Sequence, residues 1–321
     1  MKRVTDRLLR WLTGRIASGG AAILIYHRVL PREDIINPDL TVDLFEAHMR
    51  GIREHFTPVT LSEAIERLDS RSLAPRTVCV TFDDGYVNNV EVALPILERY
   101  GIPAAFFITT GFLEGGLMWN DAIAEAIRAM SSTKLDMRRW GLGILALDTF
   151  ESKGDVVRKL LAHLKYASAA ERESSGRYLA NVAAAALPDN LMMRPEHVRT
   201  LRRSGMEIGA HSVTHPILAN LSNNDARREI VESGTRLSEI LREPIRLFAY
   251  PNGKPGTDYV SRHAEMVRSA GYRAALATSA GVATHRSDRF QLPRISPWGP
   301  SPRGFSLRLM QSFYRARSGR T

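Results

Sequence analysis

Short runs of consecutive apolar residues recur along the chain and predict strands that are buried on both faces. Each run stops after a few positions at polar or turn-forming residues. Unbroken apolar runs of this length are typical of parallel sheets that helices cover on both sides. The expected strands lie at residues 21–26, 77–82, 104–108, 206–210, 247–250 and 274–277.

Helical patterns separate these runs. Residues 89–100 have helical spacing and end at Gly101, so they make a βαβ unit with the strands on either side. Residues 225–241 and 259–271 separate the later strands in the same way. This alternation predicts an α/β fold with parallel strands, either a barrel or a doubly wound sheet.

One long stretch interrupts the alternation. Residues 112–195 are mostly helical in pattern, contain many Ala, Arg and Glu residues, and include no clear strand. A connection of this length inside a compact domain is expected to carry structure or function of its own. We therefore expect one domain over residues 21–321, with a helical insertion at about residues 112–195 that covers a site.

Composition fits this picture, and charge adds a constraint. The 321 residues are 44% hydrophobic and 24% charged, which is typical of a globular protein with a sizeable core. The single cysteine, Cys79, lies in an expected strand and cannot form an internal disulfide. The formal net charge of +10 predicts attraction to anionic partners, such as phosphorylated carriers, lipid headgroups or nucleic acid.

Residues 1–20 form a basic amphipathic segment. Leu8, Trp11, Leu12 and Ile16 recur at spacings of three and four among basic residues. This pattern is typical both of a helix packed on its own domain, which we favour, and of a helix at a membrane surface. The segment lacks the apolar core of a signal peptide, and no window of about 18 apolar residues predicts a membrane-spanning helix.

Two acidic residues directly follow one of the expected strands. Asp83 and Asp84 come after residues 77–82, and Gly85 permits a sharp turn. The carboxyl ends of parallel strands are where α/β proteins build active sites. Asp-Asp-Gly is also good turn chemistry, so a helix-capping turn is the structural alternative.

A pair of histidines follows a later strand. His211 and His215 come after residues 206–210, and Pro216 favours a loop over a helix at this point. Two imidazoles and one carboxylate can bind zinc or a similar ion and leave positions open for water and substrate. The spacing alone can arise by chance, but its combination with two aspartates argues for a metal site.

Residues 81–85 (Thr-Phe-Asp-Asp-Gly) and 211–215 (His-Ser-Val-Thr-His) together resemble the NodB-homology polysaccharide deacetylases, and the resemblance covers most of the chain outside the insertion. It implies a hydrolase built on an irregular parallel (β/α) barrel of about seven strands. Residues 24–27 (Leu-Ile-Tyr-His) match the form of the circularly permuted branch, which is similar to the poly-N-acetylglucosamine deacetylases.

The resemblance also implies residue roles. Asp83 corresponds to the general base, and Asp84, His211 and His215 correspond to the metal ligands. The implied cofactor is a divalent metal, with Zn²⁺ expected and Co²⁺ or Ni²⁺ as alternatives. The implied reaction is hydrolysis of an acetyl group by an activated water, whose proton Asp83 accepts.

A third family motif is altered here. Residues 249–253 read Ala-Tyr-Pro-Asn-Gly, with alanine at the position of the family's arginine. The backbone N–H of Asn252 takes the position of the oxyanion donor, a role that needs no side chain. Arg294 is our candidate for orienting Asp83 in place of the missing arginine, and Arg246 is the weaker candidate. Either could equally be an ordinary surface arginine.

The family's last motif supplies a histidine that protonates the leaving amine, and none follows Arg294. His27, at the end of the first expected strand, takes this role, with a structural histidine as the alternative. Some aromatic and polar residues near the strand ends or in the insertion are candidates for contact with sugar, with packing as the alternative. They are Tyr250, Trp119, Asp121 and Trp298.

The favoured function is removal of N-acetyl groups from N-acetylglucosamine or a related sugar in bacterial cell-surface polysaccharide metabolism. The alternatives are an O-deacetylase or other amide hydrolase with the same metal site, and a catalytically lapsed glycan-binding or membrane-surface protein.

Nucleic acid is not expected as a partner, because no binding motif accompanies the charge. The expected partner is an acetylated glycan, and the expected location is cytoplasmic, with peripheral contact to the anionic inner membrane as an alternative role of residues 1–20. The sequence indicates no oligomeric state.

Overall fold

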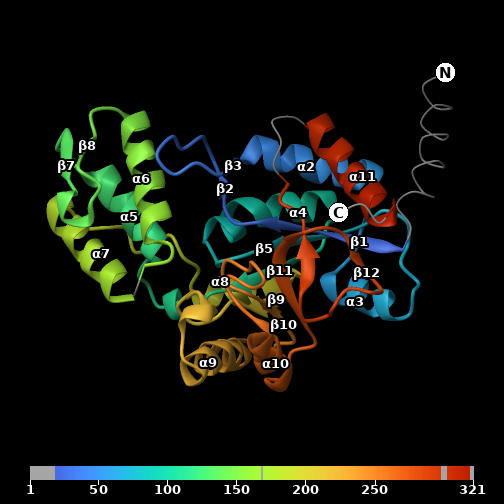
Figure 1. The fold of residues 1–321 in the computed structure, drawn as a ribbon. Helices are drawn as coiled ribbons and strands as arrows, with labels where there is room; N and C mark the ends of the chain where they lie inside the picture. The colour runs from blue at the N-terminus through green and yellow to red at the C-terminus, as the bar shows by residue number, and fades with distance from the viewer. Residues whose placement is uncertain (1–18, 168, 298–301, 319–321) are drawn as a thin grey trace.

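A ring of parallel strands forms the centre of the computed structural model, which describes residues 19–167, 169–297 and 302–318 (Figure 1). Ile295 nearly closes this ring, because its N–H donates to the Ile23 carbonyl at 2.7 Å and its carbonyl accepts from the Ile25 N–H at 3.1 Å. The predicted α/β barrel is confirmed. In order around the ring, the strands are β1 (Gly20–Tyr26), β5 (Thr77–Phe82), β6 (Ala104–Ile108), β9 (Glu207–Ala210), β10 (Leu247–Ala249), β11 (Ala274–Ala280) and β13 (Leu292–Arg294).

The ring is irregular. The register between β11 and β13 shifts between Leu276 and Ala280. One further strand extends the sheet beside β1 in antiparallel direction, where Gly20 is paired with Thr284. The additional short strands are β2 (Val29–Leu30), β3 (Leu40–Thr41), β4 (Thr57–Pro58) and the antiparallel β12 (Ala283–Thr284).

Helices pack against the outside of the ring. In α2, Phe45, Met49 and Ile52 recur at helical spacing and are fully buried. Phe45 contacts Tyr26 and Phe82 edge-on, at centroid distances of 5.3 and 5.7 Å, so α2 packs on β1 and β5. These helices are α2 (Val42–His55), α3 (Leu61–Asp69), α4 (Leu94–Tyr100) after a π-helical turn (Asn89–Ala93), α8 (Pro195–Arg203), α9 (Asn223–Leu241), α10 (Ser261–Ser269) and α11 (Pro302–Ser318).

The segment between β6 and α8 forms a separate lobe beside the barrel, drawn mainly in green in Figure 1. Its helices are α5 (Trp119–Ala129), α6 (Phe150–Leu164) and α7 (Ala169–Ala183). They enclose a core of their own, to which Ile127, Leu160 and Leu179 contribute fully buried side chains. The lobe also contains an antiparallel hairpin of β7 (Lys134–Asp136) and β8 (Ile144–Ala146), which we did not predict. Each of these strands is three residues long with a single buried side chain, too short a pattern to recognise.

The loop between β2 and β3 fastens this lobe to the barrel. Ile36 is fully buried in the core of the lobe. Asp34 accepts a hydrogen bond from Arg128 of α5 at 2.5 Å. At Gly154 of α6, an added Cβ would lie 2.6 Å from the Ile35 carbonyl oxygen, so glycine permits the close approach of helix and loop.

Residues 1–18 of the predicted basic N-terminal segment lie outside the described residues. Within the described ranges, no helix combines the length and the apolar character that crossing a membrane requires. Cys79 is buried in β5 as a free thiol.

Candidate metal centre and active-site cavity

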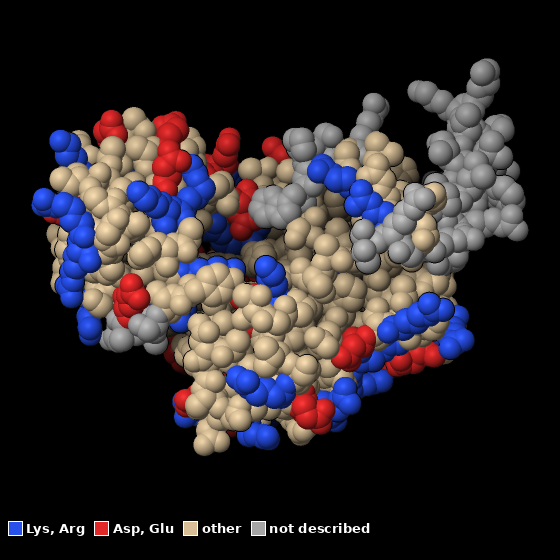
Figure 2. Space-filling view, viewed as in Figure 1, with Lys and Arg blue, Asp and Glu red and all other residues tan. Residues whose placement is uncertain are grey.

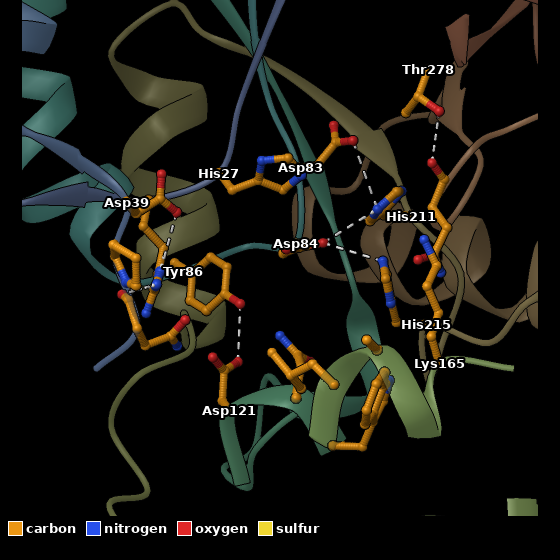
Figure 3. A pocket seen from close by; sticks show the side chains of 18 residues that line it. His27, Asp39, Asp83, Asp84, Tyr86, Asp121, Lys165, His211, His215 and Thr278 are labelled. Carbon is orange, nitrogen blue, oxygen red and sulfur yellow. Dashed lines mark hydrogen bonds and ion pairs between the residues drawn. The ribbon is translucent and has the colours of Figure 1, made fainter. Parts of the chain in front are cut away.

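The acidic and histidine motifs meet at one end of the barrel (Figure 3). Asp83 and Asp84 follow β5, whereas His211 and His215 follow β9, two strands further round the ring. The strands are parallel, so their carboxyl ends share one rim of the barrel. His27 follows β1 and joins the same group.

The turns that carry these side chains are tight. Asp84 and His215 have φ angles of +75° and +57°, in the left-handed region that costs energy for residues other than glycine. Gly85 also has a positive φ, and a Cβ there would lie 3.1 Å from the side chain of Ile108 on β6. The turn after β5 therefore requires glycine, and the strained conformation points to a functional site.

Asp84, His211 and His215 direct three potential ligand atoms toward one point. Asp84 Oδ1 lies 3.4 Å from His211 Nε2 and 3.3 Å from His215 Nε2. The ligand atoms of all three residues lie within 4.8 Å of one another. Asp84 Oδ1 is buried and has no hydrogen-bond partner among the described residues. A divalent cation would satisfy this oxygen, so the donor set fits a metal bound by two histidines and a carboxylate.

Hydrogen bonds behind the ligands fix their orientation. His211 Nδ1 lies 2.7 Å from the Ala249 carbonyl oxygen, which assigns the proton to Nδ1 and leaves Nε2 as the acceptor that a metal needs. The Glu229 carboxylate accepts from the backbone N–H groups of Val213 and Thr214 at 2.7 and 2.8 Å. This contact holds the loop between the two histidines.

Burial and neighbouring groups set the charge of the ligands. Burial raises the pKa of Asp84, but His211 and His215 outweigh this effect and hold the pKa below its usual value. Burial lowers the pKa of His215 to about 4. At neutral pH the site therefore offers an ionised carboxylate and a neutral His215 imidazole, the forms that bind metals.

Arg294 forms a bidentate ion pair with Asp83. Its NH1 and NH2 groups donate to Asp83 Oδ1 and Oδ2, each at 2.7 Å, and both side chains are buried. Its Nε donates to the Ala277 carbonyl at 2.9 Å. Burial raises the pKa of Asp83, but the Arg294 guanidinium outweighs it, and the net pKa is lowered. The structure thus places Arg294 in the expected orienting position, whereas Arg246, the weaker candidate, donates to the Gly271 carbonyl at the surface.

A cavity of about 410 Å³ opens over these residues. Barrel loops contribute His27 and Asn252, and the insertion contributes Trp119, Asp121 and Lys165. Figure 2 shows the hollow between the insertion lobe, at the left, and the barrel. The volume lies in the range of about 300–1,000 Å³ that is usual for small-ligand sites.

A second tight turn carries Asn252 into the cavity wall. Asn252 has a φ of +59°, and its carbonyl accepts a hydrogen bond from Thr278 Oγ1 at 2.8 Å. Gly253 follows with a positive φ, and a Cβ there would lie 2.9 Å from the Thr278 side chain. Glycine thus lets the turn pack on β11.

The insertion residues Trp119 and Asp121 line the cavity, and their contact with a sugar stays a prediction. Tyr86, just after the metal-site turn, donates its hydroxyl to Asp121 Oδ2 at 3.0 Å. Asp121 is 1% exposed, and burial raises its pKa to about 7. The Arg172 guanidinium lies over the Trp119 ring at 5.6 Å from its centroid.

Tyr250 is not a substrate-binding residue, and this prediction is wrong. Its side chain is fully buried and stacks on Tyr259 at a centroid distance of 3.7 Å. Its hydroxyl donates to the Phe290 carbonyl at 2.9 Å. The chain after β10 turns this ring into the core and places Asn252 at the cavity instead. Trp298, the other aromatic candidate near the strand ends, lies outside the described residues.

Several cavity residues were not predicted from the sequence. Arg28 and Tyr86 directly follow His27 and Gly85, so their adjacency to candidate positions was a usable signal. Asp39 and Lys165 come from the β2–β3 loop and the end of α6, where no motif marks them. Only the folded arrangement brings them to the cavity.

Comparison with known proteins agrees with the arrangement of these motifs. A family model for polysaccharide deacetylases matches residues 70–138 and 168–275, together more than half of the chain. These stretches contain both aspartates and both histidines of the metal site. The Bacillus subtilis (strain 168) protein YxkH, classed as a polysaccharide deacetylase, is 33% identical over 88 residues, which are 27% of this chain and 30% of YxkH.

Solved structures share the fold at low sequence identity. The Streptococcus pyogenes deacetylase PplD, in complex with acetate, is 20% identical with a TM-score of 0.62, covering 92% of this chain and 98% of its own. IcaB from Ammonifex degensii is 20% identical with a TM-score of 0.60, covering 91% of this chain and 98% of its own. A de-N-acetylase from Aggregatibacter actinomycetemcomitans is 16% identical with a TM-score of 0.56, covering 89% and 99%.

Proposed function

The chain belongs to the polysaccharide deacetylase family, and from this premise we propose that it removes the N-acetyl group from N-acetylglucosamine or a related acetamido sugar. The observation that supports the proposal most strongly is the Asp84–His211–His215 donor set beside the Asp83–Arg294 pair. The expected cofactor is a divalent cation, Zn²⁺ first, with Co²⁺ or Ni²⁺ as alternatives. The expected substrate is a polysaccharide, an oligosaccharide or a carrier-linked glycan.

A cation at this donor set supplies Lewis acidity that polarises the acetyl carbonyl and acidifies water. Asp83 then accepts the proton of the attacking water. Each of its carboxylate oxygens bonds to Arg294 and retains a second lone pair for this purpose. The lowered pKa of Asp83 keeps the base ionised before attack.

Residues of the barrel loops stabilise the oxyanion and protonate the leaving group. The backbone N–H of Asn252, in the turn at the cavity wall, donates to the oxygen that gains negative charge. His27, which lines the same cavity, donates a proton to the leaving nitrogen so that a neutral amine departs. Trp119 and Asp121 on the insertion contact the sugar ring.

The test of this proposal is the release of free amine from N-acetylglucosamine oligomers by the purified protein. We expect chelation to abolish release and Zn²⁺ or Co²⁺ to restore it. Asp83→Asn should reduce the rate by about 10³-fold or more, and His27→Ala by a smaller factor, because general base and acid catalysis contribute about 10²–10⁴-fold. Asp189→Asn is the matched control, because it makes the same change at an exposed position.

The outcomes separate the alternatives. Metal binding without amine release would reject N-acetylglucosamine oligomers as the substrate. Acetate release from O-acetylated sugars, without amine release from N-acetylated ones, would favour an O-deacetylase. Failure to bind metal would favour a lapsed, glycan-binding protein. Asp83→Asn also weakens a buried ion pair, so its melting temperature must be measured beside its rate.

We also propose that the protein acts in the cytoplasm, with contact to the inner membrane through its basic N-terminal segment as the alternative to packing of that segment on its own domain. The support is the clustering of basic and apolar residues within residues 1–20. Recovery of the full chain in the soluble fraction at low salt would remove the membrane part of this proposal.

A further inference from the structure

Charged residues of both signs line the cavity, and each carboxyl group there either has a partner on the protein or belongs to the metal donor set. Asp39 accepts from Arg28 at 3.3 Å, and Asp83 is held by Arg294. The others are Asp84, which faces the two histidines, and Asp121, which accepts from Tyr86. Among the described lining residues, Lys165 is a cation for which no carboxylate is left.

Lys165 stands where α6 ends, on the insertion side of the cavity, and is half-buried. The described residues offer its ammonium group no hydrogen bond and no ion pair. Its Nζ lies over the neighbouring Tyr166 ring, 5.5 Å from the ring centroid. A negatively charged ligand in the cavity would supply the acceptor that the described residues do not.

Other cations lie around the same hollow. Arg28 on the barrel side lines the cavity, and its guanidinium lies over the Tyr86 ring at 5.6 Å from the centroid. Lys254 is exposed, two residues beyond Asn252 in the turn at the cavity wall. Figure 2 shows Lys and Arg side chains inside the hollow between lobe and barrel. These cations lie beside the carboxylates of the same cavity, so an anionic ligand is attracted locally, at Lys165, and not by the cavity as a whole.

We propose that Lys165 binds an anionic group, a phosphate or a carboxylate, that the acetamido sugar substrate carries. This inference rests on the proposed function, and it narrows the expected substrates to glycans that carry an anionic group. A phosphate would come from a sugar joined to a phosphate or pyrophosphate carrier. A carboxylate would come from a uronic acid in the chain.

Three substrates test the inference in the metal-loaded enzyme. They are neutral diacetylchitobiose, N-acetylglucosamine 1-phosphate, and a tetrasaccharide of alternating glucuronate and N-acetylglucosamine. We expect a lower KM for one of the charged substrates than for the neutral one, and the preferred substrate identifies the anion. Lys165→Gln should raise that KM about tenfold, as loss of a charge-assisted hydrogen bond does, and leave the KM for diacetylchitobiose unchanged.

Two further variants exclude a structural explanation. Lys165→Arg keeps the charge and should retain most of the preference. Lys134→Gln removes a charge from an exposed position in β7 of the same lobe and should change neither KM. If the Lys165 charge only stabilises the negative C-terminal end of the α6 dipole, Lys165→Gln would lower the melting temperature and leave every KM unchanged. That result would overturn the inference.

Binding separates this inference from the proposed function. Calorimetric titration of N-acetylglucosamine 1-phosphate and of the glucuronate tetrasaccharide into parent and Lys165→Gln protein requires no turnover. Weaker binding to the variant would support the anion site. If the parent also released no amine, the anion site would stand and the deacetylase activity would be rejected. Equal binding of each anionic ligand to both proteins, or no binding of either to the parent, would reject the anion site whatever the activity.

Discussion

Arg294 is the largest fully buried side chain among the described residues. A guanidinium in the core is tolerable only because Asp83, Ala277 and Thr81 accept its hydrogen bonds. The same contacts fix the carboxylate that we propose as the general base. Position and charge of the base therefore depend on one residue, which lies 211 positions away in the sequence.

Arg294→Lys tests this dependence. Lysine keeps the positive charge but loses the two parallel hydrogen bonds, so the pKa of Asp83 should rise. Because Asp83 must be ionised to accept a proton, the acidic limb of the profile of kcat/KM against pH should move to higher pH. We expect kcat/KM at neutral pH to fall at least tenfold. Arg246→Lys, at an exposed position, is the matched control, and an unmoved acidic limb in Arg294→Lys would contradict the assignment.

Some residues of the site could be predicted from the sequence, and others could not. The sequence identified four residues because a motif coincides with the end of a strand: Asp83, Asp84, His211 and His215. Arg294 could be identified because Ala249 replaces the family's usual arginine. The burial of Tyr250 could not be read in this way, since the direction of a side chain after a strand depends on how the following loop turns. Lys165 was missed because its sequence neighbours carry no pattern.

At the scale of elements, one hydrogen bond joins the metal-site turn to the insertion. Tyr86 follows the candidate ligand Asp84 by two residues, and its hydroxyl donates to Asp121 on α5. Both side chains are buried. The first helix of the lobe is thus fixed to the turn that carries a candidate metal ligand.

Removing one partner of this bond should destabilise the protein. Asp121→Ala leaves the Tyr86 hydroxyl buried without its acceptor, at a cost of about 1–3 kcal/mol in the free energy of unfolding. Asp121→Asn keeps an acceptor oxygen and should cost less. Urea unfolding of Asp121→Ala, Tyr86→Phe and the double variant measures the coupling energy. Strictly additive losses would mean that the bond contributes nothing.

The packing of α11 on α2 should depend on pH. His48 of α2 is fully buried and stacks on Phe305 of α11 at a centroid distance of 4.1 Å. Burial, aided by Arg308, lowers the pKa of His48 from 6.5 to about 4. The unfolded chain therefore binds more protons between these values, and stability falls as pH falls from 6.5 toward 4, by up to about 3 kcal/mol.

Chemical denaturation at several pH values checks this expectation. His48→Gln cannot titrate and should reduce the slope of unfolding free energy against pH between 6.5 and 4, to which His215 and His263 also contribute. His55→Gln alters a half-exposed histidine of the same helix and should leave the dependence in place. An identical slope in parent and His48→Gln would rule out His48 as the cause.

For the whole molecule, metal binding should stabilise the fold. The ligands come from β5 and β9, so a bound cation links distant parts of the chain. A ligand present at about 100 times its Kd adds about 2.7 kcal/mol to the free energy of unfolding. We expect Zn²⁺ to raise the Tm of the chelated protein by several degrees, but not that of His215→Ala. A Tm unaffected by Zn²⁺ in the parent would contradict the site.

The barrel as a whole was more predictable than its insertion. Doubly buried strands must be apolar throughout, and β5 and β6 begin and end at the predicted residues. The hairpin β7–β8 has too few buried positions to leave such a signal. The cavity wall depends on how α5 and α6 dock through Ile36 and Asp34, which are tertiary contacts that no local pattern encodes.

The lobe with its own hydrophobic core has an evolutionary consequence. Cavity-facing positions of α5 and α6 that, unlike Asp121, form no bond with the barrel can vary on a scaffold that this core stabilises. Substitutions at these positions can adapt the cavity to a new glycan without changing the residues that we propose break the bond. Exchanging this lobe among homologues, with the β2–β3 loop that anchors it, is the direct engineering route to altered specificity.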